Sequence, residues 1–361
     1  MFALKLNQNI ASHRPVSHGG RYSVKNPSPD LLDYSSNINP LGASPMVRRY
    51  LKRKLDSISE YPDSDSINLR KSLQWYCKIP YEQIVIGNGA TEIIYNFCKA
   101  FLNKKTHVLI PIPTFGEYEA AANLSECKIS FFKTMNLEKD LNNFLRKIPK
   151  NGCVFVCNPN NPTGKLLFKK NLLQIIQTAK KKSSLVFVDE SFIELVPGSN
   201  ESVIKFVKQF SNLFILRSMT KSFGLAGIRV GYGIGSKQII SIMNNLKIPW
   251  NVSGLAQYAA GAALCSAFYL DKAKKIIKKE SNYLRNSISK IDGFECHDAS
   301  ANFILIKTKQ KSKTIQKKLL KKKILIRDCS TFRGLSDNYI RIAVKTRKEN
   351  QKLVKSLEKI N

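Results

Sequence analysis

Lys221 lies in a short run of residues whose types and spacing could carry out covalent chemistry. Ser218 stands three residues before it and Arg229 eight residues after it, and the apolar stretch 213–216, which we expect to be a buried strand, precedes the run. A lysine amine can form a Schiff base with an aldehyde, while a hydroxyl and a guanidinium can hold a phosphate. The run therefore favours an aldehyde cofactor that carries a phosphate group.

Two further turns could complete such a site. Residues 87–92, Gly-Asn-Gly-Ala-Thr-Glu, join an expected strand to an expected helix. Glycine allows close backbone approach there, and a helix N-terminus presents free N–H groups to an anion. Phe115 follows another expected strand and could stack on a planar ring. The alternative interpretations are an ordinary strand-to-helix turn and a core aromatic.

Polar and charged residues follow or interrupt three other apolar runs. Asn161 lies in residues 158–164, Asn-Pro-Asn-Asn-Pro-Thr-Gly, a rigid turn that does not by itself require an asparagine there. Asp189 ends a buried run, where an acid is costly unless it has a partner such as a pyridinium nitrogen. Arg341 lies in an expected strand, where a substrate carboxylate would satisfy its guanidinium. A surface arginine on an edge strand is the alternative for Arg341.

Short apolar runs alternate with helical patterns through the middle of the chain. This alternation predicts a mostly parallel sheet with helices on both faces, and such sheets place their sites at the carboxyl ends of the strands. The candidate motifs follow five of the expected strands. The expected strands are residues 83–86, 107–110, 154–156, 185–188, 213–216 and 230–234, and the helical patterns include residues 92–101 and 172–180.

The order of the expected elements predicts an α/β fold with an arm and two domains. Residues 1–36 lack clear periodicity and are expected to form an N-terminal arm. Residues 37–250 would form the large domain, and residues 251–361 a smaller α+β domain that opens with a helical stretch at 255–289. Strands are expected in the small domain at residues 294–297, 301–306, 324–327 and 339–344.

Length and composition fit a chain with a large buried core. The chain has 361 residues, of which 43% are hydrophobic, and no apolar run approaches the ~20 residues of a membrane span. The first residues contain no long apolar run, so we expect no secretory signal. Eight scattered cysteines without a Cys-x-x-Cys pair, and four dispersed histidines, argue against a zinc site. They favour free thiols in a reducing cytoplasm.

The formal net charge of +33 comes mostly from lysine. Such a charge would favour nucleic-acid binding, but no nucleic-acid-binding signature accompanies it. Lysines at 274–279 and 317–323 alternate with apolar pairs, as in amphipathic helices. We therefore favour solvated helix faces, which could help to draw in anionic phosphorylated substrates, and expect no specific nucleic-acid partner. A cofactor-free basic binding protein on the same fold stays open as an alternative.

From about residue 18 to about residue 348, the chain resembles the fold-type I pyridoxal-phosphate (PLP) enzymes, the aspartate aminotransferase superfamily. The resemblance implies PLP as the cofactor and Lys221 as the catalytic lysine that forms the Schiff base. It also implies a homodimer in which Tyr61 reaches into the partner's site. The other cofactor-binding residues that it implies are Gly89, Ala90, Thr91, Ser218 and Arg229 for the phosphate, Phe115 and Asp189 for the ring, and Asn161 for the phenolic oxygen.

Within the superfamily, the chain looks most like the branch that holds histidinol-phosphate aminotransferase and L-threonine-O-3-phosphate decarboxylase. Residues 18–20, His-Gly-Gly, resemble the phosphate-handling arm of the decarboxylase, and residues 35–42 resemble its Asn-Ile-Asn-Pro-Leu-Gly motif. Phe192 replaces the tyrosine that is usual in the aminotransferases. These features favour decarboxylation of L-threonine O-3-phosphate to (R)-1-aminopropan-2-ol O-phosphate in cobalamin biosynthesis. Transamination of histidinol phosphate, in histidine biosynthesis, is the alternative.

The resemblance also assigns residues to a small phosphorylated amino-acid substrate. Arg341, with Arg327 as a weaker candidate, is expected to hold the substrate carboxylate. His18, Asn39 and the backbone at Gly19 are expected to bind the substrate phosphate. The bond at Cα that breaks is the one held perpendicular to the cofactor ring, so a small tilt of the substrate separates the two reactions.

Overall fold

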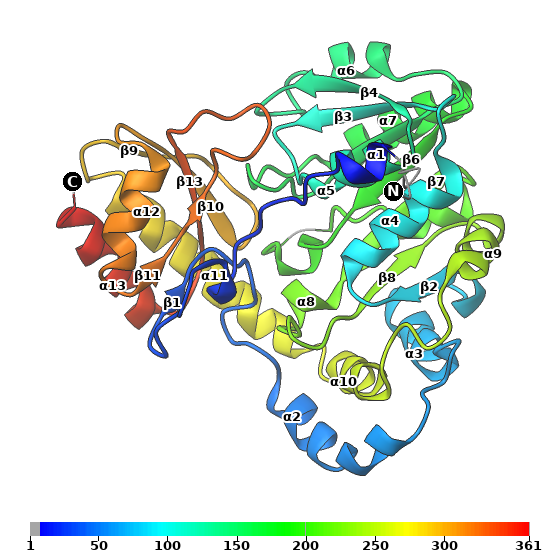
Figure 1. The fold of residues 1–361 in the computed structure, drawn as a ribbon, viewed down its shortest axis with the longest axis horizontal. Coiled ribbons are helices and arrows are strands. Elements are labelled where there is room, and N and C mark those ends of the chain that lie inside the picture. Colours follow the sequence, from blue (N-terminus) through cyan, green and yellow to red (C-terminus); the bar gives the residue numbers. More distant parts are fainter. Residues whose placement is uncertain (1–7, 199, 361) are drawn as a thin grey trace, which may run out of the picture.

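A seven-stranded sheet forms the centre of the larger part of the molecule (Figure 1). The computed structural model describes residues 8–198 and 200–360. β8 runs antiparallel to both of its neighbours, and the other neighbouring pairs are parallel, which confirms the expected mostly parallel sheet. In spatial order the strands are β2 (Ile84–Gly87), β8 (Gly231–Ile234), β7 (Leu213–Ser218), β6 (Leu185–Asp189), β5 (Cys153–Cys157), β3 (His107–Ile112) and β4 (Lys128–Lys133).

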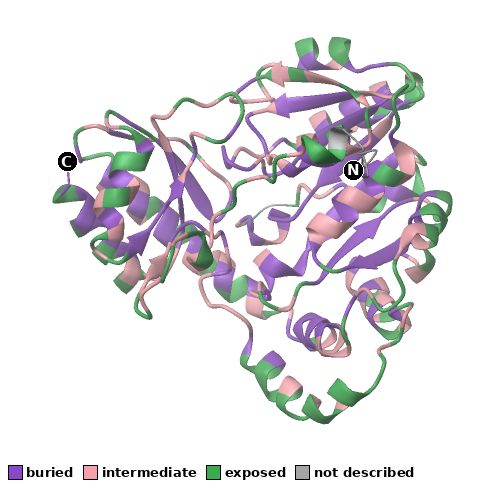
Figure 2. Ribbon diagram, viewed as in Figure 1, coloured by how far each residue is buried: buried purple, intermediate pink, exposed green. Residues whose placement is uncertain are grey.

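Helices cover both faces of this sheet and leave its central strands buried (Figure 2). The central strands are continuous apolar runs because both of their faces contact helices. One face packs against α4 (Ala90–Phe101), α5 (Glu117–Leu124) and α9 (Lys237–Leu246). The core on the other face is shared with α3 (Ile67–Cys77), α6 (Leu141–Lys147), α7 (Lys169–Lys181) and α10 (Gly254–Cys265), and α2 (Pro45–Lys52) packs against α10.

A second, four-stranded antiparallel sheet forms the smaller C-terminal part. Its strand order is β12 (Arg327–Asp328), β13 (Tyr339–Ala343), β10 (Phe303–Thr308) and β9 (Phe294–Cys296). Its apolar side chains share one core with α11 (Tyr269–Ile288), α12 (Ser312–Leu320) and α13 (Arg347–Glu358).

The helical stretch expected at residues 255–289 is two helices, α10 and α11, with a break at residues 266–268. The Ser266 hydroxyl donates to the carbonyl oxygens of Ala262 and Ala263, a side-chain bond that competes with continuation of the helix. α10 and the first half of α11 contribute to the core of the large sheet, whereas Leu284 belongs to the core of the small one. The domain boundary at residue 250 stays a prediction, and these two cores favour a later one.

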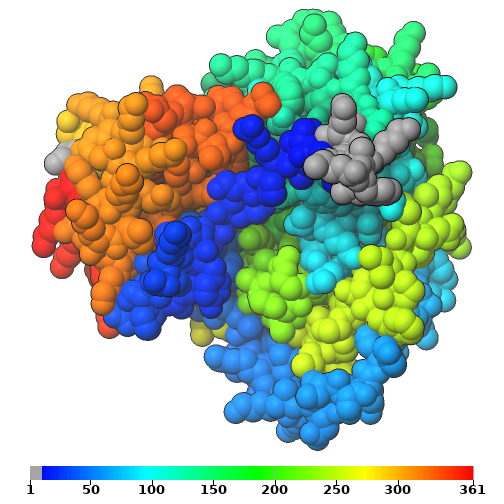
Figure 3. Space-filling model, in the orientation of Figure 1, coloured from blue at the N-terminus to red at the C-terminus, as the bar shows by residue number. Residues whose placement is uncertain are grey.

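The N-terminal segment links the two parts of the molecule. β1 (Leu32–Asp33) pairs in parallel with β11 (Ile324–Leu325), and the buried Tyr34 joins the small core. Nearer the N-terminus, α1 (Gln8–Ala11) lies beside α5 of the large part. The segment between them, drawn in blue in Figure 3, crosses the front of the molecule from one part to the other. The short helices η1 (Arg21–Ser23), η2 (Leu55–Ser59), η3 (Tyr81–Gln83), η4 (Ile193–Leu195), η5 (Ile204–Lys208) and α8 (Met219–Ser222) complete the fold.

None of the helices in residues 8–198 and 200–360 is both long enough and apolar enough to cross a bilayer.

Candidate active site

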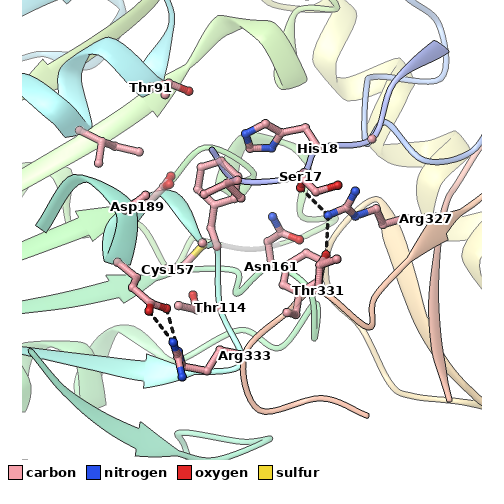
Figure 4. Close-up of a pocket in the computed structure, with 18 of the residues that line it drawn as sticks. Ser17, His18, Thr91, Thr114, Cys157, Asn161, Asp189, Arg327, Thr331 and Arg333 are labelled. Atoms are coloured by element: carbon pink, nitrogen blue, oxygen red, sulfur yellow. Dashed lines mark hydrogen bonds and ion pairs between the residues drawn. The ribbon is translucent and has the colours of Figure 1, made fainter. Parts of the chain in front are cut away.

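A cavity of about 1250 Å³ opens where the carboxyl ends of five strands face the N-terminal arm and the small sheet. Figure 4 shows His18 and Asn161 between Asp189 and Arg327 in this view. The expected convergence of the motifs is therefore present. The residues predicted from the sequence that line the cavity are His18, Gly19, Ala90, Thr91, Phe115, Asn161, Asp189, Ser218, Lys221, Arg229, Arg327 and Arg341.

The turn between β2 and α4 forms a cradle with Arg229. A Cβ atom on Gly89 would lie 2.5 Å from Nη2 of Arg229, and Gly89 has a φ of +84°. Both facts call for glycine at this position. Ala90 and Thr91 begin α4, so the free N–H groups of a helix N-terminus lie beside a guanidinium. Thr220, which the sequence did not single out, lines the cavity and accepts a 3.4 Å hydrogen bond from Arg229.

Asp189 ends β6 as a buried acid on the floor of the cavity. Its Oδ2 accepts a 2.6 Å hydrogen bond from the Tyr118 hydroxyl, and its Oδ1 accepts a 2.8 Å bond from the Ser191 N–H. Burial raises the pKa of Asp189, and this effect outweighs the hydrogen bonds, which act to lower it. A cation in the cavity, such as a protonated ring nitrogen, would stabilise the ionised carboxylate.

Arg341 lies on β13 as a buried guanidinium. It donates from Nη1 to Oδ1 of Asn161 and from Nη2 to the Ser35 carbonyl oxygen at 2.7 Å, while its Nε has no partner. No carboxylate of the described residues lies within ion-pair distance of it. Burial lowers the pKa of Arg341 to about 10. An anionic ligand would supply the charge partner that the protein lacks.

Lys221 projects from α8, directly after β7, and lines the same cavity. Burial, followed by the charges of Arg341 and Arg229, lowers the pKa of Lys221 to about 8. A neutral amine is the nucleophilic form, so this shift raises the fraction of Lys221 that can attack a carbonyl near neutral pH. The arginines thus serve both to attract anions and to activate the amine.

The N-terminal arm forms the outer wall of the cavity. His18 lies 5.8 Å from the Phe115 ring between centroids, and its Nε2 lies 2.6 Å from Oε1 of Glu117. Arg327 donates to the Ser17 carbonyl oxygen at 2.6 Å, and no described carboxylate pairs with it. Gly19 packs so closely on residue 35 that a Cβ atom would lie 2.7 Å from its carbonyl oxygen. The arm is thereby tied to both sides of the cavity.

The structure places Asn39, which we expected to bind the substrate phosphate, outside the residues that line the cavity. Its side chain donates to the Ser222 carbonyl oxygen at 2.8 Å and accepts from the Leu41 N–H at 2.9 Å, and it does not line the cavity. Its backbone N–H also donates to the carbonyl oxygen of Lys221, so Asn39 supports the loop that carries the lysine. Asn37 lines the cavity instead, and its buried Oδ1 has no partner. Only the fold separates the two asparagines, because both belong to the same sequence motif.

Tyr61 lies outside the cavity of its own chain. Its side chain is 84% exposed, and its ring lies 4.9 Å from that of Trp250 between centroids. Exposure leaves it available to a second subunit. Its place in a partner's site stays a prediction.

The described residues fit PLP. The cradle at Gly89 and Arg229 suits a phosphate, and Asp189 suits the ring nitrogen. Lys221 is an amine with a lowered pKa within the same cavity. When bound, this cofactor would supply an aldehyde carbon for an amine and a ring that takes up electrons released at the substrate Cα.

The Lys221 pKa predicts a pH-dependent stability difference in the cofactor-free protein. The pKa of Lys221 in the folded protein, about 8, lies below the ordinary lysine value of 10.5, so the unfolded state binds more protons between these values. Wild-type stability therefore rises with pH across this window. Lys221→Met should be more stable than wild type at pH 7, and the difference should shrink as the pH approaches 10.

Urea unfolding at pH 7, 9 and 10 measures this difference in the free energy of unfolding. Lys275→Met, at an exposed position on α11, is the matched control and should show a difference that does not change with pH. A Lys221→Met difference that stays constant across this range would contradict the lowered pKa.

The cradle predicts a selective effect of Gly89→Ala on cofactor retention. The added methyl group would displace the Arg229 guanidinium and strain the backbone. Loss of one charge-assisted hydrogen bond should raise the Kd for PLP by about tenfold or more. The control is Gly227→Ala, because a Cβ atom there would meet open space. Titration of the cofactor-free variants with PLP, followed by absorbance, should separate them; equal Kd values would count against the cradle.

Comparison with known proteins places the chain in one family. The family model described as aminotransferase class I and II matches residues 29–357. The chain is 32% identical over 340 residues to a histidinol-phosphate aminotransferase from Methanocaldococcus jannaschii, which covers 92% of this chain and 89% of the relative. It is 35% identical over 349 residues to a protein named "Putative threonine-phosphate decarboxylase" from Caldanaerobacter subterraneus, which covers 95% of this chain and 94% of the relative.

Solved structures of both kinds of enzyme share the fold. The histidinol-phosphate aminotransferase from Clostridium acetobutylicum matches with a TM-score of 0.84 at 33% identity, over 91% of this chain and 99% of that one. The L-threonine-O-3-phosphate decarboxylase from Porphyromonas gingivalis matches with a TM-score of 0.83 at 27% identity, with the same coverage of the two chains. The chain has the fold-type I architecture and belongs to the class I and II aminotransferase family, whose cofactor is pyridoxal 5′-phosphate.

Proposed function

We propose that this enzyme decarboxylates L-threonine O-3-phosphate to (R)-1-aminopropan-2-ol O-phosphate and CO₂, a step of cobalamin biosynthesis. The observation that carries the proposal is the pair of buried guanidiniums, Arg327 and Arg341, which share one cavity with Lys221 and lack carboxylate partners among the described residues. Buried charges need partners. A small substrate that carries both a carboxylate and a phosphate would supply one to each arginine.

Arg341 is the proposed carboxylate-binding residue. Its hydrogen bonds to Asn161 and to the Ser35 carbonyl oxygen fix the guanidinium from two sides. A fixed guanidinium can hold a carboxylate in one orientation, and orientation decides which bond at Cα breaks. The cofactor-binding roles that the family resemblance implies for Asn161 and for the other residues of the site are part of the same proposal.

For the substrate phosphate we propose His18, as expected, together with Arg327, which the sequence had favoured for the carboxylate, and Asn37 in place of Asn39. Arg327 is held by the Ser17 carbonyl oxygen and by the Thr331 hydroxyl, and His18 lies on the same arm. Asn37 lines the cavity wall, where its Nδ2 could donate to a phosphate oxygen. The phosphate would then lie beneath the N-terminal arm.

Lys221 is the proposed acid and base of the reaction. Its lowered pKa allows the amine to give up and regain a proton near neutral pH. As the bond between Cα and the carboxylate breaks, CO₂ leaves and a proton must be added to Cα. Lys221 can deliver this proton, while the Asp189 carboxylate stabilises positive charge on the cofactor ring nitrogen.

Phe192 supports the decarboxylase branch. It lines the cavity next to Ser191, and its ring packs against Phe303 at 5.0 Å between centroids. The aminotransferases of this superfamily usually have tyrosine at this position, so the chain lacks one hydroxyl that would bind the cofactor's phenolic oxygen. The relative named as a threonine-phosphate decarboxylase adds support over nearly the whole chain.

Transamination of histidinol phosphate is the second candidate function. The same two arginines support it. Arg327 and Arg341 could also bind the two carboxylates of a dicarboxylic amino donor such as glutamate. Several relatives and one solved structure named as histidinol-phosphate aminotransferases are about as similar to this chain as the decarboxylases are. In that reaction Lys221 would move a proton away from Cα instead of adding one after CO₂ leaves.

A homodimer in the cytoplasm is the proposed working form. Exposed apolar side chains at Ile58, Tyr61, Ile248 and Trp250 offer a surface for a second subunit, and the family resemblance places Tyr61 in the partner's site. All eight cysteines are free, as a reducing compartment would keep them. The mass of the PLP-loaded protein in solution tests the dimer.

A product assay tests the proposed reaction. Purified, PLP-loaded protein with L-threonine O-3-phosphate and no keto acid should release equal amounts of CO₂ and 1-aminopropan-2-ol O-phosphate. Arg341→Gln should lower kcat/KM by about 30-fold or more, because it removes a buried partner of the substrate carboxylate. Arg285→Gln, which removes a guanidinium paired with Asp298 outside the cavity, is the control and should have a small effect.

Other products would identify a different reaction. Formation of glutamate from histidinol phosphate and 2-oxoglutarate, without release of CO₂ from L-threonine O-3-phosphate, would assign the chain to the aminotransferases. A protein that takes up no PLP but shifts RNA in a salt-sensitive manner would instead support a basic binding protein.

A further inference from the structure

Glu117 is a buried acid beside a cavity that should attract anions, and it contacts His18, which lines that cavity. It begins α5, and its side chain is 6% exposed. Both of its oxygens are occupied: Oε1 lies 2.6 Å from Nε2 of His18, and Oε2 accepts a 2.7 Å hydrogen bond from the Tyr95 hydroxyl. None of the steps derived above uses this acid. Its position therefore calls for another explanation.

The environment of Glu117 keeps its carboxyl group ionised. Burial alone would raise the pKa of Glu117, but hydrogen bonds from His18 and Tyr95 outweigh that effect and lower it. The charge of His13, on the same arm, acts in the same direction. A buried carboxylate of this kind is stable only with its donors in place, so it constrains where those donors lie.

The hydrogen bond to Glu117 fixes the position of the His18 ring, which has few other contacts. Half of the His18 side chain is exposed, and it belongs to a stretch of the arm between α1 and η1 that has no regular structure. Its Nε2 is engaged by Glu117, which leaves Nδ1 as the nitrogen that can contact a ligand. Without that bond, His18 would lose rotamer freedom on binding an anion, and binding would be weaker.

Tyr95 and the arm backbone complete the arrangement. Tyr95 comes from α4 and holds the second oxygen of Glu117, so the carboxylate cannot turn away from the arm. On the other side of the cavity, Arg327 holds the Ser17 carbonyl oxygen one residue before His18, as Figure 4 shows. The arm is thus fixed at successive residues by groups from opposite walls.

We propose that Glu117, itself oriented by Tyr95, is a positioning residue that sets His18 to bind the phosphate of the substrate. The inference rests on the proposed function for its phosphate-bearing substrate, and it deepens that function by naming the group that orders the phosphate-binding arm. Glu117 contacts neither substrate nor cofactor in this account. Its effect passes entirely through His18.

A double-mutant cycle on the PLP-loaded enzyme tests this dependence. Glu117→Gln should weaken the binding of L-threonine O-3-phosphate, so that KM rises about tenfold in initial-rate measurements with little change in kcat. In a His18→Ala background the same substitution should have no further effect, because its only route is gone. Tyr95→Phe is a milder second variant and should weaken binding about threefold. Glu295→Gln, which removes an exposed acid on β9 outside the cavity, is the control for charge and should change KM less than twofold.

Two outcomes would overturn the inference. One is a full tenfold effect of Glu117→Gln in the His18→Ala background, which would show a structural role independent of the histidine. The other is an equal loss of binding for L-threonine, which has no phosphate. If wild-type enzyme binds histidinol phosphate but not L-threonine O-3-phosphate, the decarboxylase proposal fails while the same cycle, run with histidinol phosphate, still decides the role of Glu117.

Discussion

The burial of the Arg341 guanidinium is the constraint on which the site depends. Three segments share it: β13 carries the residue, the turn after β5 supplies Asn161, and the N-terminal arm supplies the Ser35 carbonyl oxygen. A buried cation with only neutral acceptors is costly. The small sheet, the large sheet and the arm must therefore be correctly assembled before the cation is tolerated, and an anionic ligand completes its environment.

The same cation links substrate recognition to the reactive amine. Arg341 and Arg229 both lower the pKa of Lys221, to which burial contributes most. An anion bound to Arg341 would neutralise part of this field and raise the proton affinity of the lysine again. Substrate binding would thereby convert Lys221 from a neutral nucleophile towards a proton donor. The proposed reaction needs these two roles in the same order.

Much of the fold follows from local patterns in the sequence. β5, β6 and β7 are continuous apolar runs because helices cover both of their faces. Such runs are visible in the sequence, so these three strands could be predicted from it. β4 was not expected, because it is an edge strand with lysine at both ends and only partly buried side chains. β1 was missed for a related reason, since two residues gain their strand geometry only by pairing with β11.

The site was less fully predictable than the sheet. Motifs at strand ends predicted the residues around Lys221. The carboxyl ends of parallel strands lie at one edge of the sheet, whatever the conformation of the loops between them. No comparable rule predicts the contacts of the N-terminal arm. His18 and Glu117 are 99 positions apart, and only the folded chain brings them together. Likewise, Asn37 and Asn39 are two positions apart in one motif, and only the path of the loop decides which of them faces the cavity.

The central claim is that two buried arginines select a substrate with two anionic groups. Initial rates of the PLP-loaded enzyme with L-threonine O-3-phosphate as substrate, and with L-threonine and 1-aminopropan-2-ol O-phosphate as competing ligands, test it most directly, because the last two ligands each lack one of those groups. The account predicts that each single-anion ligand binds at least about tenfold more weakly than L-threonine O-3-phosphate. Equal affinity for L-threonine O-3-phosphate and either single-anion ligand would contradict it, since one of the two guanidiniums would then have no role in substrate binding.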